Sequence, residues 1–213
     1  MENRDIYPKV FTWLFIGLLI TFITGYSLSL NPNLLYGFSG MTAVILIIAE
    51  VAIALFFSFR LQKMSKNTAI VCYGLYSIIT GITLSGIFII YKLTSIIYIF
   101  LIAAALFLVF AIIGKTTKLD LSKLGTYLFM ILFAVIVLSV VNIFLGLETM
   151  ELIICIISIV VFLGYIAYDM QKVRSLVSVV GEDKAAIFGA FQLYLDFINL
   201  FIDLLRLLGK SND

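Results

Sequence analysis

The chain has 213 residues, of which 63% are hydrophobic and 12% charged, with a formal net charge of +2 and a mean hydropathy of +1.21. A soluble domain is about half apolar and about one-quarter charged, so this composition excludes a soluble fold and offers no nucleic-acid-binding surface. Histidine is absent, which excludes Ser-His and Cys-His catalytic pairs and His-liganded metal sites.

Seven apolar segments are long enough to cross a membrane, since each helical span needs ~20 apolar residues. They cover residues 10–30, 35–59, 68–90, 95–114, 124–146, 150–168 and 186–208. None of them alternates polar and apolar residues, which excludes barrel strands. We therefore expect an all-α polytopic membrane protein with a single transmembrane domain over residues 1–213.

Basic residues alternate from loop to loop along these segments. One side of the membrane collects 11 of the 14 lysines and arginines, and the other side collects 3. Cytoplasmic loops carry such an excess of positive charge. The pattern predicts a cytoplasmic N-terminus and a C-terminus outside.

Small residues recur every four positions in two of the segments, which favours close helix packing in lipid. These residues are Gly17, Thr21, Gly25 and Ser29 in the first segment, and Ser77, Gly81 and Ser85 in the third. Both cysteines, Cys72 and Cys155, fall within apolar runs and are expected to be free thiols.

The last segment carries polar residues on one narrow stripe. At ~100° per residue the stripe is less than a quarter-turn wide, and it consists of Gln192, Asp196, Asn199, Asp203 and Arg206. A charged side chain at the bilayer centre costs ~2.5–3.5 kcal/mol, so the stripe must face protein or water. We therefore expect the last helix to be central and wrapped by the other six.

Acidic residues in two other segments offer partners for this stripe. Asp169 is expected at the cytoplasmic end of the sixth segment, and Glu50 lies near the middle of the second segment, ~15 Å from Arg60. Oxygen ligands and rings of carboxylates suit hard cations such as Ca²⁺. The pattern predicts a diffuse cation pathway that includes Glu50, Asn199, Asp203 and Arg206.

Three stretches of the chain resemble the transmembrane Bax inhibitor motif family, also called Bax inhibitor-1-like, in its prokaryotic form. They are LYLDFINLF at 193–201, LLRLLG at 204–209 and YDMQ at 168–171. The resemblance implies a central seventh helix and a passive, pH-sensitive Ca²⁺ leak. It also implies an anti-apoptotic role in eukaryotic relatives.

The resemblance further assigns roles to individual residues. Asp169 and Asp196 match the family's paired aspartates, which act as the pH sensor and are candidate Ca²⁺ ligands. Arg60 matches the basic partner that latches the pair. Glu50 and Arg206 match a second acid–base couple along the pathway, whereas Asp203 stands where a neutral residue is more usual.

Two carboxylates within hydrogen-bonding reach share a proton and titrate together. Our hypothesis is that the aspartate pair, latched to Arg60, closes the cytoplasmic end of the pathway and that protonation weakens the latch. A proton-coupled cation transporter and a non-transporting scaffold or cell-death regulator remain alternatives. We expect no enzymatic activity and no cofactor, with Ca²⁺ as the permeant ion.

The expected partners are the lipid bilayer, Ca²⁺ and H⁺, and no nucleic acid. The short termini favour a bacterial cell membrane. Asp183 is expected to cap the last span, because aspartate side chains accept hydrogen bonds from free N–H groups at helix starts.

Overall fold

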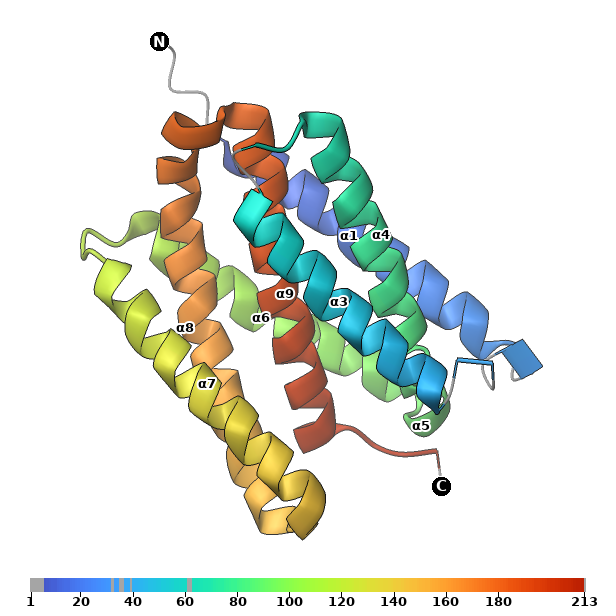
Figure 1. Ribbon diagram of the computed structural model, residues 1–213. Helices are drawn as coiled ribbons and strands as arrows, with labels where there is room; N and C mark the ends of the chain where they lie inside the picture. Colours follow the sequence, from blue (N-terminus) through green and yellow to red (C-terminus); the bar gives the residue numbers. More distant parts are fainter. Residues whose placement is uncertain (1–5, 32, 35–36, 39, 61–62, 213) are drawn as a thin grey trace. The chain divides into compact units, whose positions relative to one another are not determined.

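The computed structural model describes residues 6–31, 33–34, 37–38, 40–60 and 63–212. Within these ranges the chain is helical and has no β-strand, apart from an isolated bridge between Tyr91 and Ser211 (Figure 1). Seven of its helical segments are long and apolar enough to cross a membrane. The prediction of an all-α protein with seven spans is confirmed.

Each span corresponds to one helix, except that the third is made of a long and a short helix. The helices are α1 (Tyr7–Ser29), α3 (Met41–Arg60), α4 (Lys66–Leu84), α5 (Ile87–Ile90), α6 (Leu93–Thr116), α7 (Ser122–Leu145), α8 (Glu148–Val180) and α9 (Glu182–Leu208).

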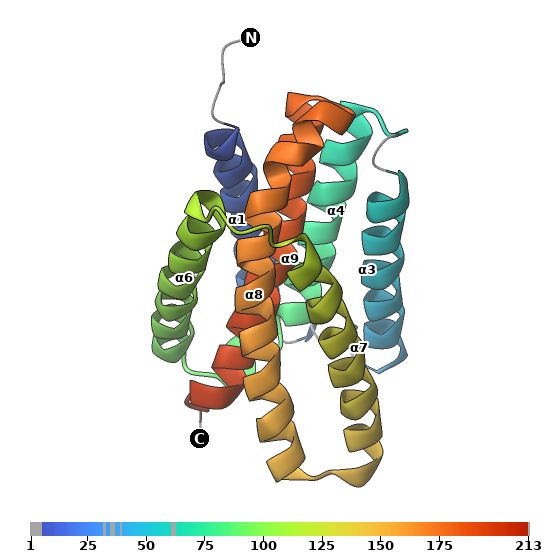
Figure 2. The same cartoon turned by 90° about the vertical axis from the view of Figure 1, so that its left-hand side faces the viewer.

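Helix α8 differs most from its predicted span. It has 33 residues and ends at Val180 rather than near residue 168. At ~1.5 Å per residue it is about 50 Å long, more than the ~30 Å hydrocarbon core requires, and it remains helical past Lys172 and Arg174 (Figure 2). The predicted loop after residue 168 was wrong because the end of the apolar run was taken as the end of the helix.

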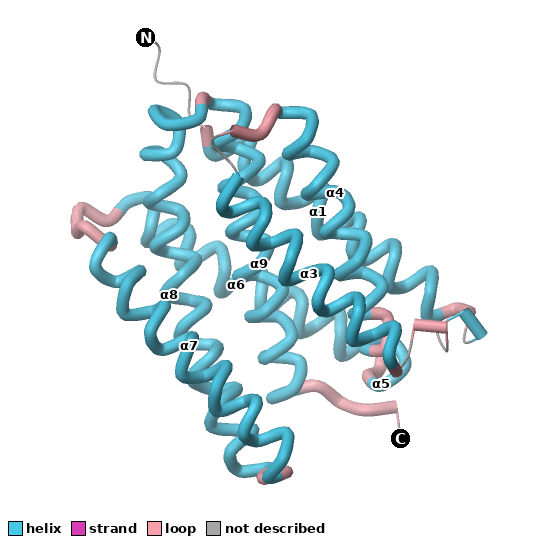
Figure 3. The backbone as a smooth tube through the Cα atoms, in the orientation of Figure 1, coloured by secondary structure: helices cyan, strands magenta, loops and turns pink. Residues whose placement is uncertain are grey.

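Glycine ends α8 and separates it from α9. Gly181 has a φ of +82°, a left-handed conformation that residues with a side chain adopt only with strain. Its N–H donates to the carbonyl of Val177 over 3.0 Å. Only this residue lies between the two helices, so the connection is a tight break (Figure 3).

Contacts between residues divide the chain into two compact units. The first contains the described residues of Met1–Lys92, Val173–Tyr194 and Ser211–Asp213, and the second contains Leu93–Lys172 and Leu195–Lys210. Helices α8 and α9 therefore contribute residues to both units. The expectation of a single domain stays a prediction.

In the first unit, α1 and α4 pack through the predicted small residues. A Cβ on Gly81 would lie 2.7 Å from the carbonyl oxygen of Thr21, and a Cβ on Gly25 would lie 2.9 Å from that of Gly81. Thr21 Oγ1 donates to the carbonyl of Ser77 over 2.9 Å. The prediction of close packing at these positions is confirmed, because no larger side chain fits between the two backbones.

Aromatic stacking connects α3 to the first half of α9 in the same unit. Phe57 is fully buried, and its ring centroid lies 5.7 Å from that of Phe188 and 4.5 Å from that of Phe191. Phe57 is the one residue of α3 that is buried. The stack is therefore the main anchor of this helix.

In the second unit, α6 and α9 meet through aromatic rings, and α6 and α8 through backbone contact. The centroid of Phe197 lies 5.2 Å from that of Phe100 and 5.7 Å from that of Phe107. A Cβ on Gly114 would collide with the backbone of Ala167. The positions of α6 and α8 relative to each other therefore depend on glycine at 114.

Helix α9 is the most buried of the spanning helices. In its most apolar stretch 78% of the residues are buried, against 6–33% in the other six spans. This contrast agrees with the cost of exposing its polar stripe to lipid. The arrangement of six helices around a central α9 stays a prediction.

Candidate functional site

Asp169 of α8 and Asp196 of α9 lie together within the second unit. Each residue is only 5% exposed, and their carboxyl groups are within hydrogen-bonding reach of each other. Asp169 Oδ1 and Asp196 Oδ2 are also buried and have no hydrogen-bond partner. Two carboxylates this close are costly to ionise together, so the arrangement favours one shared proton. The two aspartates predicted as a sensor are neighbours; their role as a sensor stays a prediction.

Sequence reasoning missed the basic residue of this unit that acts on the pair. Lys172 exerts an electrostatic attraction on both carboxyl groups. Its Nζ lies 5.3 Å from the ring centroid of Tyr168. Because α8 was expected to end before it, Lys172 was assigned to a loop. Its spacing of three residues from Asp169 was the signal, since residues three apart share a helix face.

Tyr165 is a second neighbour of the aspartate pair that was not predicted from the sequence. Tyr165 precedes Asp169 by one helical turn and interacts electrostatically with both Asp169 and Asp196. Its ring centroid lies 6.4 Å from that of Tyr168. The pair is therefore flanked by a lysine on one turn of α8 and a tyrosine on another.

Arg60 is the last residue of α3 and is exposed. It belongs to the first unit, whereas the aspartate pair belongs to the second. Its role as the latch of the pair stays a prediction.

Glu50 lies halfway along α3, in the first unit, and is partly buried. The side chains of Thr80 and Thr83 on α4 are within hydrogen-bonding reach of its carboxyl group. The predicted couple of Glu50 with Arg206 stays a prediction, because Arg206 belongs to the second unit.

Asp203 and Arg206 form an ion pair one turn apart on α9. Arg206 Nη1 lies 4.0 Å from Asp203 Oδ1, and Asp203 is 8% exposed. Cys155 Sγ donates to the backbone carbonyl of Asp203 over 3.0 Å, and both cysteines are free. Asn199 Nδ2 donates a hydrogen bond of 2.7 Å to the backbone carbonyl of Leu195 in its own helix. The predicted pathway residues on α9 therefore have partners within the second unit.

The described residues contain no group of three or more His, Cys, Asp or Glu side chains placed to hold a metal ion. Binding of Ca²⁺ by Asp169 and Asp196 alone stays a prediction.

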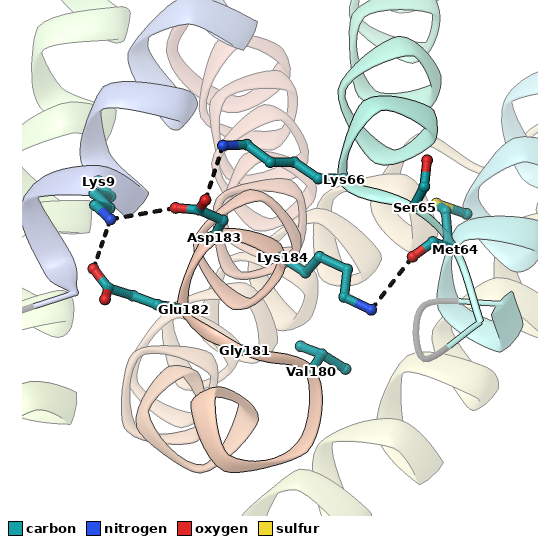
Figure 4. Close-up of a pocket in the computed structure, with 9 residues that line it drawn as sticks. All are labelled: Lys9, Met64, Ser65, Lys66, Val180, Gly181, Glu182, Asp183 and Lys184. Atoms are coloured by element: carbon teal, nitrogen blue, oxygen red, sulfur yellow. Dashed lines mark hydrogen bonds and ion pairs between the residues drawn. The ribbon is translucent and has the colours of Figure 1, made fainter.

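An ion-pair cluster joins the starts of α1, α4 and α9 in the first unit (Figure 4). Lys9 Nζ lies 2.7 Å from Glu182 Oε1 and 3.3 Å from Asp183 Oδ1, and Lys66 Nζ lies 2.8 Å from Asp183 Oδ2. Lys184 Nζ donates to the carbonyl of Met64 over 3.3 Å. These side chains line a pocket with Ser65, Val180 and Gly181.

The cluster corrects one prediction. Asp183 was expected to cap the last span, but α9 begins at Glu182, so Asp183 is the second residue of the helix. Its carboxylate pairs with the two lysines instead. The cap prediction was wrong because the helix starts directly after Gly181.

These features define a polytopic α-helical membrane protein with a buried pair of neighbouring aspartates. The chain belongs to the family described as Inhibitor of apoptosis-promoting Bax1, whose family model matches residues 3–213. The resemblance drawn from the sequence motifs is confirmed.

Bacterial proteins of similar length match the chain. It is 38% identical over 214 residues to the inner membrane protein YbhL of Escherichia coli K12, which covers 95% of this chain and 90% of that protein. It is also 38% identical over 212 residues to a protein of Borreliella burgdorferi named only as uncharacterized, covering 96% and 91%. A third relative, from Deinococcus radiodurans, is 31% identical over 216 residues and covers 100% and 93%. The chain is thus similar along nearly its whole length to bacterial proteins, one of which is named as an inner membrane protein.

Proposed function

We propose that the protein is a passive Ca²⁺ leak across a bacterial cell membrane and that the protonation of Asp169 and Asp196 controls it. The observation that carries the proposal is the burial of both carboxyl groups within hydrogen-bonding reach of each other. Family membership and a relative in a bacterial inner membrane support the setting. The proposal includes no catalytic step and no cofactor, and Ca²⁺ is the permeant ion.

The proposed control depends on the charge of the pair. With one shared proton the pair carries a single negative charge, and the hydrogen bond holds α8 and α9 together at this point. Loss of that proton leaves two neighbouring negative charges, which repel each other and attract a divalent cation. Full protonation removes the charge and weakens any ion pair with a basic partner.

Two basic residues are candidates for that partner in the proposed mechanism. Arg60 is the proposed latch, and its planar group suits paired recognition of carboxylates. Lys172 attracts both carboxyl groups. In the proposal, Lys172 stabilises the charged pair, and Arg60 engages it in the closed state.

The rest of the proposed pathway follows the acidic and polar residues of the spanning helices. We assign Glu50, Asn199, Asp203 and Arg206 to it, and an excess of 11 basic residues over 3 supports a cytoplasmic N-terminus. Intramembrane carboxylates usually mark ion or proton pathways, because they are costly to keep in lipid.

Calcium flux into liposomes tests this function. The purified protein is reconstituted with a Ca²⁺-sensitive dye inside, and uptake is followed across a pH series for the natural protein, Asp169→Asn and Asp196→Asn. Asp120→Asn is the matched control, because Asp120 is an exposed loop residue. We expect pH-dependent uptake in the natural protein and the control, and a flattened pH profile in the other two variants.

Two results of this assay would contradict the proposal. Uptake equal to that of protein-free liposomes at every pH would exclude a leak. A natural pH profile in both Asp169→Asn and Asp196→Asn would exclude the sensor. Saturable uptake coupled to proton counterflow would instead identify a proton-coupled transporter.

A further inference from the structure

Glu50 lies in the first unit with an unsatisfied carboxyl oxygen. Its Oε1 is buried and has no hydrogen-bond partner. None of the ion pairs between described residues involves Glu50. A buried carboxylate without a counter-charge is costly in free energy. The groups next to Glu50 therefore show what could stabilise its charge.

Two threonine hydroxyl groups lie near this carboxyl. Thr80 and Thr83 of α4 are within hydrogen-bonding reach of it. Thr80 is only 5% exposed, and its Oγ1 has no well-formed hydrogen bond although Tyr76 and Tyr194 also lie close to it. Glu50 Oε1 and Thr80 Oγ1, on two helices that pack against each other, are therefore both buried without a hydrogen-bond partner.

Tyr194 of α9 is held in place by a hydrogen bond to α1 and by ring contacts with α4. Tyr194 Oη lies 2.5 Å from Thr21 Oγ1, and its ring centroid lies 5.9 Å from that of Tyr76. The ring centroids of Tyr73 and Tyr194 are 5.6 Å apart. Residues from α1, α4 and α9 thus form one polar cluster within the first unit, and Tyr76 and Tyr194 of this cluster interact electrostatically with Glu50.

Unsatisfied buried polar atoms in a folded protein call for an ion or a water. The oxygens here are one carboxylate and several neutral hydroxyls, a ligand set that suits a hard cation. A single negative charge is balanced by a single positive charge, whereas a divalent cation would leave a net charge in an apolar surrounding.

We propose that Glu50, Thr80 and Thr83 form a binding site for a monovalent hard cation of the Na⁺ class. Glu50 supplies the charge, and the two threonine hydroxyls supply neutral ligands. The Thr83 hydroxyl donates to the carbonyl of Ile79 and keeps a lone pair for the cation. The site differs from the aspartate pair in its charge, its ligands and its unit. Glu50 is also assigned to the proposed Ca²⁺ pathway, but binding of Na⁺ at rest requires no Ca²⁺ flux, so the two proposals are tested separately.

Thermal unfolding of the protein in nanodiscs tests the site. The single tryptophan, Trp13, reports unfolding by fluorescence, and NaCl is titrated against choline chloride at constant ionic strength. Because a ligand that binds only the folded state stabilises it, a Na⁺ concentration about 100 times Kd raises Tm by roughly 5–10 °C. We expect this rise in the natural protein and its loss in Glu50→Gln.

Matched variants separate ligand loss from general damage. Thr80→Val removes one hydroxyl and is expected to weaken the apparent Na⁺ affinity by about tenfold, as one lost ligand of ~1.4 kcal/mol would. Thr12→Val and Glu151→Gln change an exposed threonine and an exposed glutamate, and both keep the natural response. Direct binding of radioactive Na⁺ gives a second measurement for any variant that unfolds early.

A natural protein whose Tm is the same in NaCl and in choline chloride would overturn the proposal. So would Glu50→Gln with a natural Na⁺ response. Asp169→Asn is expected to keep the Na⁺ response, so failure of the Ca²⁺ leak and failure of the Na⁺ site give different results.

Discussion

We expect substitution of Gly114 on α6 by alanine to disturb the aspartate pair through its contact with α8. A Cβ at position 114 would lie 2.7 Å from the backbone C and Cα of Ala167, whereas ordinary contacts begin at 3.4 Å. The carbonyl oxygen of Ala167 would lie closer still, so the two backbones must separate by at least about 0.7 Å, and backbone atoms cannot rotate away as a side chain can. Ala167 precedes Asp169 by two residues on α8.

This displacement exceeds the tolerance of a hydrogen bond between oxygens, which spans about 2.5–3.0 Å. We expect Gly114→Ala to weaken the contact between Asp169 and Asp196 and to lower the free energy of unfolding by about 1–3 kcal/mol, as overpacking does. Denaturant unfolding in detergent measures the stability, and Ca²⁺ uptake across pH measures the function.

The matched control is Gly74→Ala, because a Cβ at position 74 meets no atom within 4 Å. In the interior of α4 this change should be neutral or stabilise the helix by up to about 1 kcal/mol. Natural stability and a natural pH profile in Gly114→Ala would refute the packing argument.

Three further predictions concern other parts of the chain. Phe57→Ala removes a fully buried ring that stacks on Phe188 and Phe191, so the free energy of unfolding should fall by about 3–5 kcal/mol in a denaturant titration, with exposed Phe59→Ala as its control. Asp183→Asn breaks exposed ion pairs with Lys9 and Lys66; its small effect on Tm should disappear in high salt, and an effect that persists there would contradict a surface role. Hydrogen bonds from the Ser122 side chain and, second, from the Ser122 backbone N–H lower the pKa of Asp120. The resulting stabilisation of the fold is present above the unfolded-state pKa and is lost as the pH falls through the folded-state pKa. Ser122→Ala should raise the pKa of Asp120 in an NMR titration, and an unchanged pKa would exclude the side chain as the cause.

The helical class, the seven spans and the burial of the last helix could be predicted from the lengths of the apolar runs and the positions of polar residues within them. The apolar runs exceed the membrane thickness, and the polar stripe of Asp196, Asn199 and Asp203 cannot face lipid at low cost. The small residues at Gly25 and Gly81 likewise predict their own close contact.

Other features depend on contacts between distant segments and could not be predicted. Helix α8 continues past Lys172 because the residues that follow are compatible with a helix. These residues are less apolar, so the hydropathy of the sequence gives no sign that the helix continues there. The hydroxyl groups around Glu50 come from helices far apart in sequence, and threonine and tyrosine residues within apolar runs carry no signal of their partners. The ion pairs of Asp183 could be predicted only if the first residue of α9 were already known.

The shared proton between Asp169 and Asp196 can be measured by infrared difference spectroscopy, without any flux measurement. The protonated-carboxyl band is recorded between acidic and neutral pH for the natural protein and for each single Asp→Asn variant. We predict that one band of the natural protein is lost or displaced in both variants, because the proton belongs to the pair. Two independent bands, each removed by only one substitution, would contradict the shared proton and the proposed control of the pathway.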